Sequence, residues 1–187
     1  SNIISRLPPC FALDRKLILK AVVLDPLQFQ YAHDSLQEDR TFVNRLLKIS
    51  PKILQFATPA IRSDKSFMEK ATYVSRDALQ YASWNLIDNK LFMRKMIDID
   101  SRNYKFASNR LQKLHEFAKI AFKDNGYLLE FAPKKIQNNK SLVKIAIRSK
   151  SSAIKFASES LQKNEMLKIL ARKKTSIRSK EELEKFL

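Results

Sequence analysis

Residues 64–86 read DKSFMEKATYVSRDALQYASWNL, and residues 139–161 read NKSLVKIAIRSKSSAIKFASESL. Both stretches begin with Asp or Asn, carry a bulky apolar residue three positions later and an alanine four positions after that, and close with aromatic-Ala-Ser-x-x-Leu. The second stretch begins 75 positions after the first, which is three steps of 25 positions. A fixed period of this length is the sequence signature of a repeat protein.

An aromatic-Ala pair recurs at every 25th position along most of the chain, without insertion or deletion. A Leu or Ile follows five positions after each aromatic residue. Because alanine is small, we expect it where two helices approach closely, and we expect the recurring aromatic rings to lie in the core as well. The six pairs are Tyr31-Ala32, Phe56-Ala57, Tyr81-Ala82, Phe106-Ala107, Phe131-Ala132 and Phe156-Ala157.

Helix-capping residues recur in the same frame, because Asp, Asn and Ser accept hydrogen bonds from the unpaired N–H groups of a first helical turn. Each repeat is predicted to hold two short helices of about 8–11 residues. The second should end or kink after the aromatic-Ala pair, where Pro59 and Pro133 stand, with one further turn beyond. One cap column comprises Asp14, Asp39, Asp64, Asn89, Asn139 and Asn164, with Leu114 as its exception, and the other comprises Asp25, Ser50, Ser75, Asp100 and Asn125.

These columns predict an all-α fold. One repeat cannot bury its apolar face alone but can do so against its neighbours, so we expect an α-solenoid of about six 25-residue helical-hairpin repeats. We predict a single domain over residues 1–187, with tandem repeats over 14–172 and degenerate caps over 1–13 and 173–187. Ser179 and Glu182 form a capping box, which predicts a charged terminal helix over Ser179–Leu187.

The composition excludes several function classes. A single glycine among 187 residues leaves almost none for β-hairpins, nucleotide-binding loops or nucleophile elbows. Cys10 is the only cysteine, so no intramolecular disulfide can form, and a reducing, cytoplasmic compartment is expected. The net charge is +17, and residues 121–187 alone hold sixteen Lys and Arg against seven Asp and Glu. So basic a chain is drawn to polyanions or to acidic protein surfaces.

The pattern of Asp64 to Leu86 and of Asn139 to Leu161 resembles the repeats of the domain of unknown function 4116 family, and the resemblance covers residues 14–172. Such repeats occur in proteins of intracellular bacteria such as Legionella, of protists and of large viruses. The resemblance implies a helical-repeat module of a secreted effector that acts inside a host cell. It implies no catalytic residues.

Residues able to carry catalysis are few. Of the two histidines, His33 takes the place of a Ser or Thr cap, and His115 takes the place of Arg or Lys. No His-Glu-x-x-His, Cys-x-x-Cys or EF-hand pattern is present, which removes the common metal sites. We therefore predict no catalytic, cofactor-binding or metal-binding residues, no small-molecule substrate and no enzymatic activity.

Basic residues form two columns that predict a binding surface. Because packed helices lie roughly 10 Å apart, each column should line one edge of the stack. The alternative is that these charges only keep the protein soluble. The first ladder, at the first position of each long helix, comprises Arg15, Arg40, Lys65, Lys90, His115 and Lys140, with Arg94, Lys119 and Lys144 beside it. The second ladder, five positions further on, comprises Lys20, Arg45, Lys70 and Lys95.

Trp84 is the one tryptophan, and its column otherwise holds polar residues and a proline. It forms either an exposed anchor for a partner, as tryptophan often does at interfaces, or a local packing contact over a neighbouring repeat.

Three functions remain open. We expect a non-catalytic scaffold that binds a protein with an acidic surface. The alternative is a polyanion-binding module for nucleic acid or an anionic membrane, although sequence-specific RNA reading is disfavoured because the core is expected to claim the aromatic rings. A third possibility is an accessory domain that positions an enzyme on the same chain.

Overall fold

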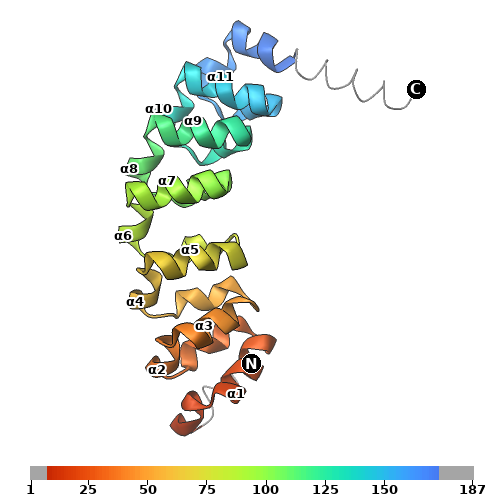
Figure 1. Ribbon diagram of the computed structural model, residues 1–187. Helices are drawn as coiled ribbons and strands as arrows, with labels where there is room; N and C mark the ends of the chain where they lie inside the picture. The colour runs from red at the N-terminus through yellow and green to blue at the C-terminus, as the bar shows by residue number, and fades with distance from the viewer. Residues whose placement is uncertain (1–7, 173–187) are drawn as a thin grey trace, which may run out of the picture. The chain divides into compact units, whose positions relative to one another are not determined.

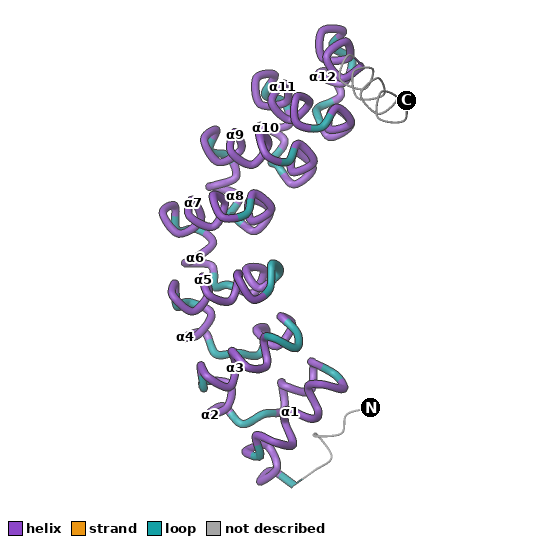
Figure 2. Tube along the Cα trace, turned by 45° about the vertical axis from the view of Figure 1, so that its right-hand side comes forward, coloured by secondary structure: helices purple, strands orange, loops and turns teal. Residues whose placement is uncertain are grey.

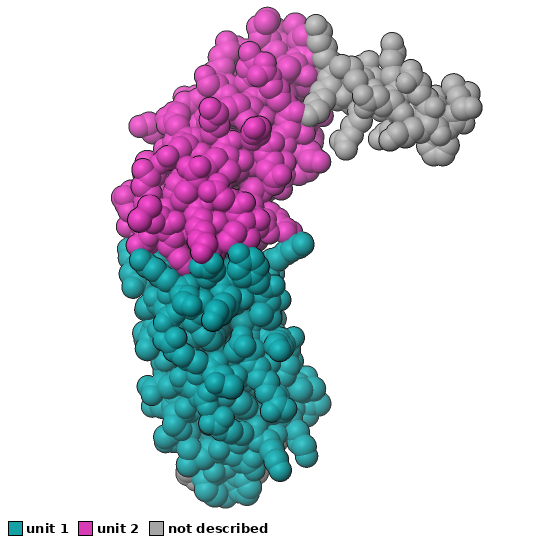
Figure 3. Space-filling view, viewed as in Figure 1, with its two compact units in different colours: residues 1–86 teal, residues 87–187 magenta. Residues whose placement is uncertain are grey.

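The computed structural model describes residues 8–172, and every regular element in that range is a helix (Figure 1; Figure 2). The predicted all-α repeat solenoid is confirmed, since the same run of helices recurs with a period of 25 positions. The chain divides into two compact units, Ser1–Leu86 and Ile87–Leu187, which Figure 3 colours separately. Residues 1–7 of the predicted N-terminal cap and the predicted helix Ser179–Leu187 lie outside the described residues.

Each repeat of the first unit consists of a long α-helix, a 3-10 helix and a single-turn α-helix. In Figure 1 the long helices α1, α3 and α5 follow one another along this unit, with the single-turn helices α2 and α4 along one edge. The elements are η2 (Pro9–Leu13); α1 (Arg15–Leu24), η3 (Pro26–Tyr31) and α2 (Asp34–Gln37); α3 (Arg40–Leu47), η4 (Pro51–Gln55) and α4 (Pro59–Arg62); and α5 (Lys65–Val74), η5 (Ala78–Tyr81) and α6 (Trp84–Ile87).

The second unit repeats this order. Residues 165–172 are helical and hold the position of the next long helix. The elements are α7 (Lys90–Ile99), η6 (Ser101–Phe106) and α8 (Asn109–Gln112); α9 (His115–Asp124), η7 (Gly126–Phe131) and α10 (Lys134–Gln137); and α11 (Lys140–Ser149), η8 (Ser151–Phe156) and α12 (Glu159–Gln162).

The predicted caps, apart from Ser75, set where these helices begin, and η5 begins at Ala78 without a side-chain cap. The Asp39 carboxylate accepts hydrogen bonds from the backbone N–H groups of Thr41 and Phe42, at 2.9 and 3.0 Å. Leu114, the exception in the column, gives α9 no side-chain cap. A cap of this kind stabilises a helix by roughly 1 kcal/mol. The same bonds are made by Asp14, Asp64, Asn89, Asn139 and Asn164 on the long helices and by Asp25, Ser50, Asp100 and Asn125 on the 3-10 helices.

The second helix of each repeat is shorter than predicted. It is a 3-10 helix, six residues long in η3, rather than an α-helix of about 8–11 residues. The N–H of Ala32 donates to the carbonyl of Phe29, and the backbone at Ala32 is then extended, with φ −67° and ψ 144°. The predicted break and the further turn are confirmed, and Pro59 begins the further turn α4.

The recurring aromatic rings are not in the core, contrary to the prediction. Positions three apart share one face of a 3-10 helix, which has three residues per turn. Phe29 and Ala32 occupy the buried face, so Tyr31 lies between them and is only half-buried. The ring of Phe131 is 48% exposed. The alanines of the pairs are buried as predicted, apart from the half-buried Ala82.

A glutamine that recurs at the end of the single-turn helix joins this helix to the preceding 3-10 helix by hydrogen bonds. In the first repeat the side-chain amide of Gln37 donates to the carbonyl of Ala32 at 2.9 Å and to that of Phe29 at 3.3 Å. The carbonyl of Ala32 follows the end of the 3-10 helix and gains a partner in this way, whereas the carbonyl of Phe29 also accepts the N–H of Ala32. Sequence reasoning missed this column, although its members are spaced by multiples of the repeat period. Gln112, Gln137 and Gln162 make the equivalent bonds in the second unit.

Adjacent repeats are joined by backbone as well as by apolar packing. The N–H that precedes each single-turn helix donates to a carbonyl near the end of the preceding single-turn helix, as Ser83 does to Arg62 at 2.9 Å. Pro133 has no N–H and cannot make this bond. The other pairs, with the same separation in sequence, are His33 to Ala12, Thr58 to Gln37, Ser108 to Ile87 and Ser158 to Gln137.

The single glycine marks the closest approach of two helices in the second unit. A Cβ atom on Gly126 would lie 2.2 Å from the carbonyl oxygen of Ala146 in α11. Its N–H donates to Ser149 Oγ at 3.2 Å. Gly126 is therefore required by the contact between η7 and α11.

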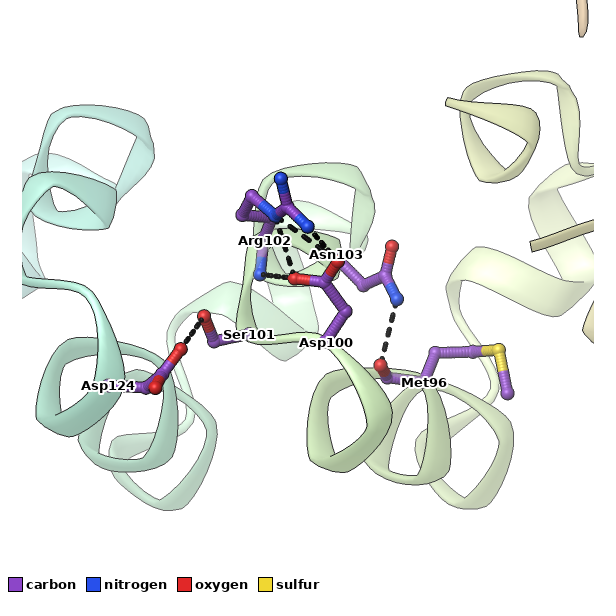
Figure 4. A network of polar contacts seen from close by, with 6 residues as sticks. All are labelled: Met96, Asp100, Ser101, Arg102, Asn103 and Asp124. Carbon is purple, nitrogen blue, oxygen red and sulfur yellow. Dashed lines mark hydrogen bonds and ion pairs between the residues drawn. The ribbon is translucent and has the colours of Figure 1, made fainter. Parts of the chain in front are cut away.

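Buried polar contacts also hold η6 between two long helices (Figure 4). The buried amide of Asn103 donates to the carbonyl of Met96 in α7 at 2.8 Å. Ser101 Oγ donates to the carboxylate of Asp124 in α9 at 2.6 Å. Because a buried polar group without a partner is costly, these bonds fix the register of three consecutive elements.

Candidate functional site

The first ladder pairs with the caps of the following repeats in the first unit. The guanidinium of Arg15 lies 2.5 Å from the carboxylate of Asp39, and that of Arg40 lies 2.5 Å from Asp64. A cation at the first position of a helix opposes the helix dipole. The arginine is nevertheless favourable at this position because it neutralises the capping carboxylate of the next repeat, 24 positions later.

These carboxylates are more acidic than an ordinary aspartate. The pKa of Asp39 is lowered, chiefly by the hydrogen bond from the N–H of Phe42 and further by Arg15. The pKa of Asp64 is lowered by the N–H of Phe67 and then by Arg40. The cap and the ion pair therefore act together on each carboxylate.

In the second unit the first ladder is only partly paired. Lys90 lies 2.9 Å from Glu116, and His115 Nε2 lies 2.9 Å from the side-chain nitrogen of Asn139. Lys140 is exposed and makes no ion pair with any residue between 8 and 172. Lys65, the remaining member in the first unit, is exposed as well. The ladder is therefore not one uniform free surface.

The second ladder is exposed throughout. Lys20, Arg45 and Lys70 lie on the outer faces of α1, α3 and α5, and Lys95 lies on α7. Later members of the same column are aliphatic, at Ile120, Ile145 and Leu170. The basic column thus ends within the second unit, where an apolar column continues it.

Trp84 is exposed on the first residue of α6, where 64% of its surface is accessible. Most of the side chain is therefore open to solvent, as the interpretation of Trp84 as an anchor for a partner requires.

At the interface between α7 and α9, acidic and basic side chains form ion pairs with one another. Glu116, at the second position of α9, lies 2.9 Å from Lys90 and 3.8 Å from Arg94. Arg94 also pairs with Asp98 at 2.9 Å. The hydrogen bond from Lys90 is the largest cause of the lowered pKa of Glu116. One acid at this position is therefore sufficient to engage two cations of the preceding helix.

The next interface, between α9 and α11, lacks that acid, because Ser141 stands where α9 has Glu116. A cavity of about 400 Å³ opens here, which we call the α9/α11 groove. Lys119 and Lys123 of α9 make no ion pair with another described residue. The residues that line the α9/α11 groove are Lys119, Lys123, Ile145, Arg148 and Ser149.

A second cavity of about 390 Å³ follows between α11 and residues 165–172, and we call it the terminal groove. Met166 occupies the acid's position here. Lys140, Lys144 and Arg148 line one wall of the groove, and Met166, Ile169 and Leu170 supply its apolar surface. Arg148 lines both grooves, so they are adjacent.

The acids near the two grooves are already engaged. Asp124, at the end of α9, accepts the hydrogen bond from Ser101. Glu165 lies 2.8 Å from Lys168, and that lysine is the main cause of its lowered pKa. The grooves therefore combine an apolar floor with walls that carry an excess of positive charge.

Sequence reasoning found only part of this site. It singled out Lys119, Lys140 and Lys144 but missed the apolar side chains and treated the cations as uniform ladders. The signal that could have located the grooves is the change from lysine at position 95 to isoleucine at 120 and 145, together with Ser141 and Met166 at the positions equivalent to Glu116.

Two kinds of site are absent from the described residues. Between residues 8 and 172, no group of three or more His, Cys, Asp or Glu side chains is placed to hold a metal ion. In the same range, no helix has the length and hydrophobicity that a membrane span requires.

A family model matches this repeat frame three times. The model described as Domain of unknown function (DUF4116) matches residues 14–62, 39–87 and 115–162, which together make up more than half of the chain. The chain belongs to this family. No curated protein and no solved structure matches it.

Each DUF4116 match spans two consecutive repeats, from the start of one long helix to the single-turn helix of the next repeat. The third match begins at His115 and ends at Gln162, so it contains the whole α9/α11 groove. The apolar wall of the terminal groove lies beyond that match.

Proposed function

We propose that this DUF4116 protein is a non-catalytic scaffold that binds a partner protein through an acidic surface of that partner. The observation that carries the proposal is the gathering of lysines without ion pairs around exposed apolar side chains. Arg15, Arg40 and Lys90 have partners within the chain, whereas Lys119, Lys123, Lys140 and Lys144 surround two apolar grooves and have none among the described residues.

The apolar floor favours a protein partner over a polyanion. Phosphate groups are bound by cations and need no hydrophobic contact. Protein interfaces combine apolar contacts at their centre with a polar rim, and Ile145, Met166 and Leu170 lie among the lysines in this way. As the setting, we propose a secreted effector in the reducing cytosol of a host cell, on the basis of Cys10 and the family resemblance.

A pull-down from nuclease-treated eukaryotic lysate tests this function, with washes at about 0.15 M and then about 0.5 M salt. We expect a discrete partner that survives the second wash and is lost when Lys119 and Lys144 are both changed to Glu. The matched control changes Lys20 and Lys70 to Glu on the first unit and should retain the partner. Equal loss with both variants would contradict a local site.

Nucleic acid binding is the second candidate, and cations that lie beside half-buried aromatic rings favour it. The ammonium of Lys105 lies 4.5 Å from the ring centroid of Phe106, and that of Lys155 lies 4.8 Å from that of Phe156. Single-stranded nucleic acid binds where aromatic rings and cations alternate. The argument that the core claims these rings is wrong for this structure, so the aromatic column no longer counts against this alternative.

Titration with labelled single-stranded RNA separates the two functions. Nucleic acid binding predicts an affinity that falls steeply with salt and weakens when Phe131 is changed to Ala. The scaffold function predicts weak RNA binding that Phe131→Ala leaves unchanged.

A further inference from the structure

We propose that the α9/α11 groove and the terminal groove together form a docking site for one acidic amphipathic α-helix of the partner protein. This inference rests on the proposed function and specifies the shape of the partner.

The grooves select apolar side chains of a limited number and spacing. Cavities of about 400 and 390 Å³ lie at the small end of ligand sites, which span roughly 300–1,000 Å³. Each can therefore take a small set of aliphatic side chains, which would contact Ile145 in one groove and Met166, Ile169 and Leu170 in the other.

The separation of the two grooves sets the spacing of the apolar side chains, or anchors, that the partner helix would place in them. Consecutive long helices pack roughly 8–10 Å apart, and the two grooves lie on either side of α11. An α-helix rises 1.5 Å per residue, so residues i and i+7 lie about 10.5 Å apart on one face. A helix that crosses α11 can therefore place one apolar anchor in each groove.

An α-helix pairs its own backbone N–H and C=O groups through hydrogen bonds, whereas an extended peptide leaves these groups without partners in its own chain. One common way for an extended peptide to pair its backbone is to add a strand to a sheet edge, and residues 8–172 contain no strand that could offer such an edge. The outer faces of α9 and α11 present side chains only, so the bound segment must pair its own N–H and C=O groups.

The walls select negative charge around those anchors. Lys119 and Lys123 lie on one side of Ile145, and Lys140, Lys144 and Arg148 flank the apolar surface of the terminal groove. Acidic residues beside the two apolar anchors would meet the lysines of these walls, Lys119, Lys123, Lys140 and Lys144. Since Glu116 neutralises Lys90 and Arg94 at the preceding interface, carboxylates of a partner can do the same one repeat later.

The test uses a fluorescein-labelled synthetic peptide of about 16 residues, rich in Glu and Ala, with leucines at positions i and i+7. A control peptide has the same composition, but its second leucine is at i+5, which lies on another face of the helix. Anisotropy at about 0.15 M salt with the full chain should show binding of the first peptide about tenfold tighter than that of the control.

Three variants locate the site. Ser141→Glu places an acid where α9 has Glu116, within reach of Lys119, and should weaken binding about tenfold. Thr41→Glu makes the same charge change at the equivalent position of α3 and should leave the affinity within about twofold. Ile145→Ser tests the apolar floor and should weaken binding at about 0.5 M salt as well as at about 0.15 M.

Four outcomes would overturn the inference. The two peptides could bind equally. Anionic vesicles of phosphatidylserine could bind with the same dependence on Ser141→Glu, which would make the site a lipid surface. A chain without residues 179–187 could bind the peptide at least about tenfold tighter, which would make the chain's own terminus the occupant. The pull-down partner could also depend on Ser141→Glu while the peptide fails to bind; then the proposed function stands and the helical partner does not.

Discussion

Where a side chain caps a long helix in both units, the capping residues differ by a single chemical group, and Leu114 of the second unit is the exception without such a cap. The first unit caps its long helices with Asp14, Asp39 and Asp64, whereas the second unit uses Asn89 and Asn139. Both side chains offer the oxygen that a cap requires, but only the carboxylate can also neutralise the cation of the preceding repeat. The change from Asp to Asn therefore keeps the fold and releases positive charge.

The largest effect is expected at the contact that holds η7 against α11. Gly126→Ala places a Cβ atom 2.2 Å from the carbonyl oxygen of Ala146 unless the backbone shifts. Overpacking against backbone should lower the free energy of unfolding by about 3 kcal/mol, measured by urea denaturation. Pro51→Ala is the control at the equivalent position of η4, where a Cβ atom is already accommodated. An equal loss in both variants would mean that Gly126 makes no special contact.

The cap and the ion pair can be separated at Asp64. Asp64→Ala removes both and should cost about 1–2 kcal/mol of unfolding free energy. Asp64→Asn keeps the bond from the N–H of Phe67 but loses the pair with Arg40, as in the second unit, and should cost only a few tenths of a kcal/mol. If the two variants were equally unstable, the ion pair rather than the cap would carry the effect.

The repeat period and the cap columns predicted the fold because they depend on local backbone chemistry. A side-chain oxygen just before a helix accepts hydrogen bonds from the N–H groups of the first turn, so the capping role of Asp39 is visible from the sequence without coordinates. The position of Tyr31 was mispredicted because an aromatic-Ala pair fits the face of an α-helix, whereas the segment is a 3-10 helix whose buried face holds Phe29 and Ala32. The difference between the two helical periods, about 3.6 and about 3 residues per turn, moved the ring toward solvent.

The candidate site was less predictable because it depends on which charges remain after neighbouring repeats have paired. The first ladder is a uniform column in the sequence, yet Arg40 contacts Asp64 and Lys140 contacts no acid among the described residues. Such pairing joins residues that are 24 positions apart. It becomes visible only once the stacking of repeats brings one helix start beside the next cap.

The acid titration of Asp39 measures the ion pair directly. Its pKa lies below the ordinary value of about 3.9, mainly because the N–H of Phe42 donates to the carboxylate and secondarily because of Arg15. Because the folded-state pKa is lowered, the stabilisation is complete above about pH 4 and is lost as the pH falls through the lowered value. NMR titration of Arg15→Gln should show the Asp39 pKa raised but still below the ordinary value. Arg45→Gln should leave it unchanged, and a similar rise in that control would indicate a general charge effect.

The smallest effect on stability should come from giving the second unit the cap of the first. Asn164 caps the helix at residues 165–172 through the N–H of Leu167, at 3.3 Å, and lies 24 positions after Lys140. In the first unit, residues with this spacing form the pairs Arg15–Asp39 and Arg40–Asp64. Asn164→Asp keeps the capping oxygen and should raise the melting temperature by no more than about 2 °C, because an exposed ion pair contributes little.

Its effect on binding should be larger, because the new carboxylate would engage Lys140 and reduce the positive charge of the terminal groove. Affinity for the acidic helical peptide should fall about threefold in the anisotropy assay. Asn89→Asp makes the same change outside the two grooves and should leave the affinity unaltered. If Asn164→Asp stabilised the protein without weakening the peptide, Lys140 would contribute to the stack and not to the docking site.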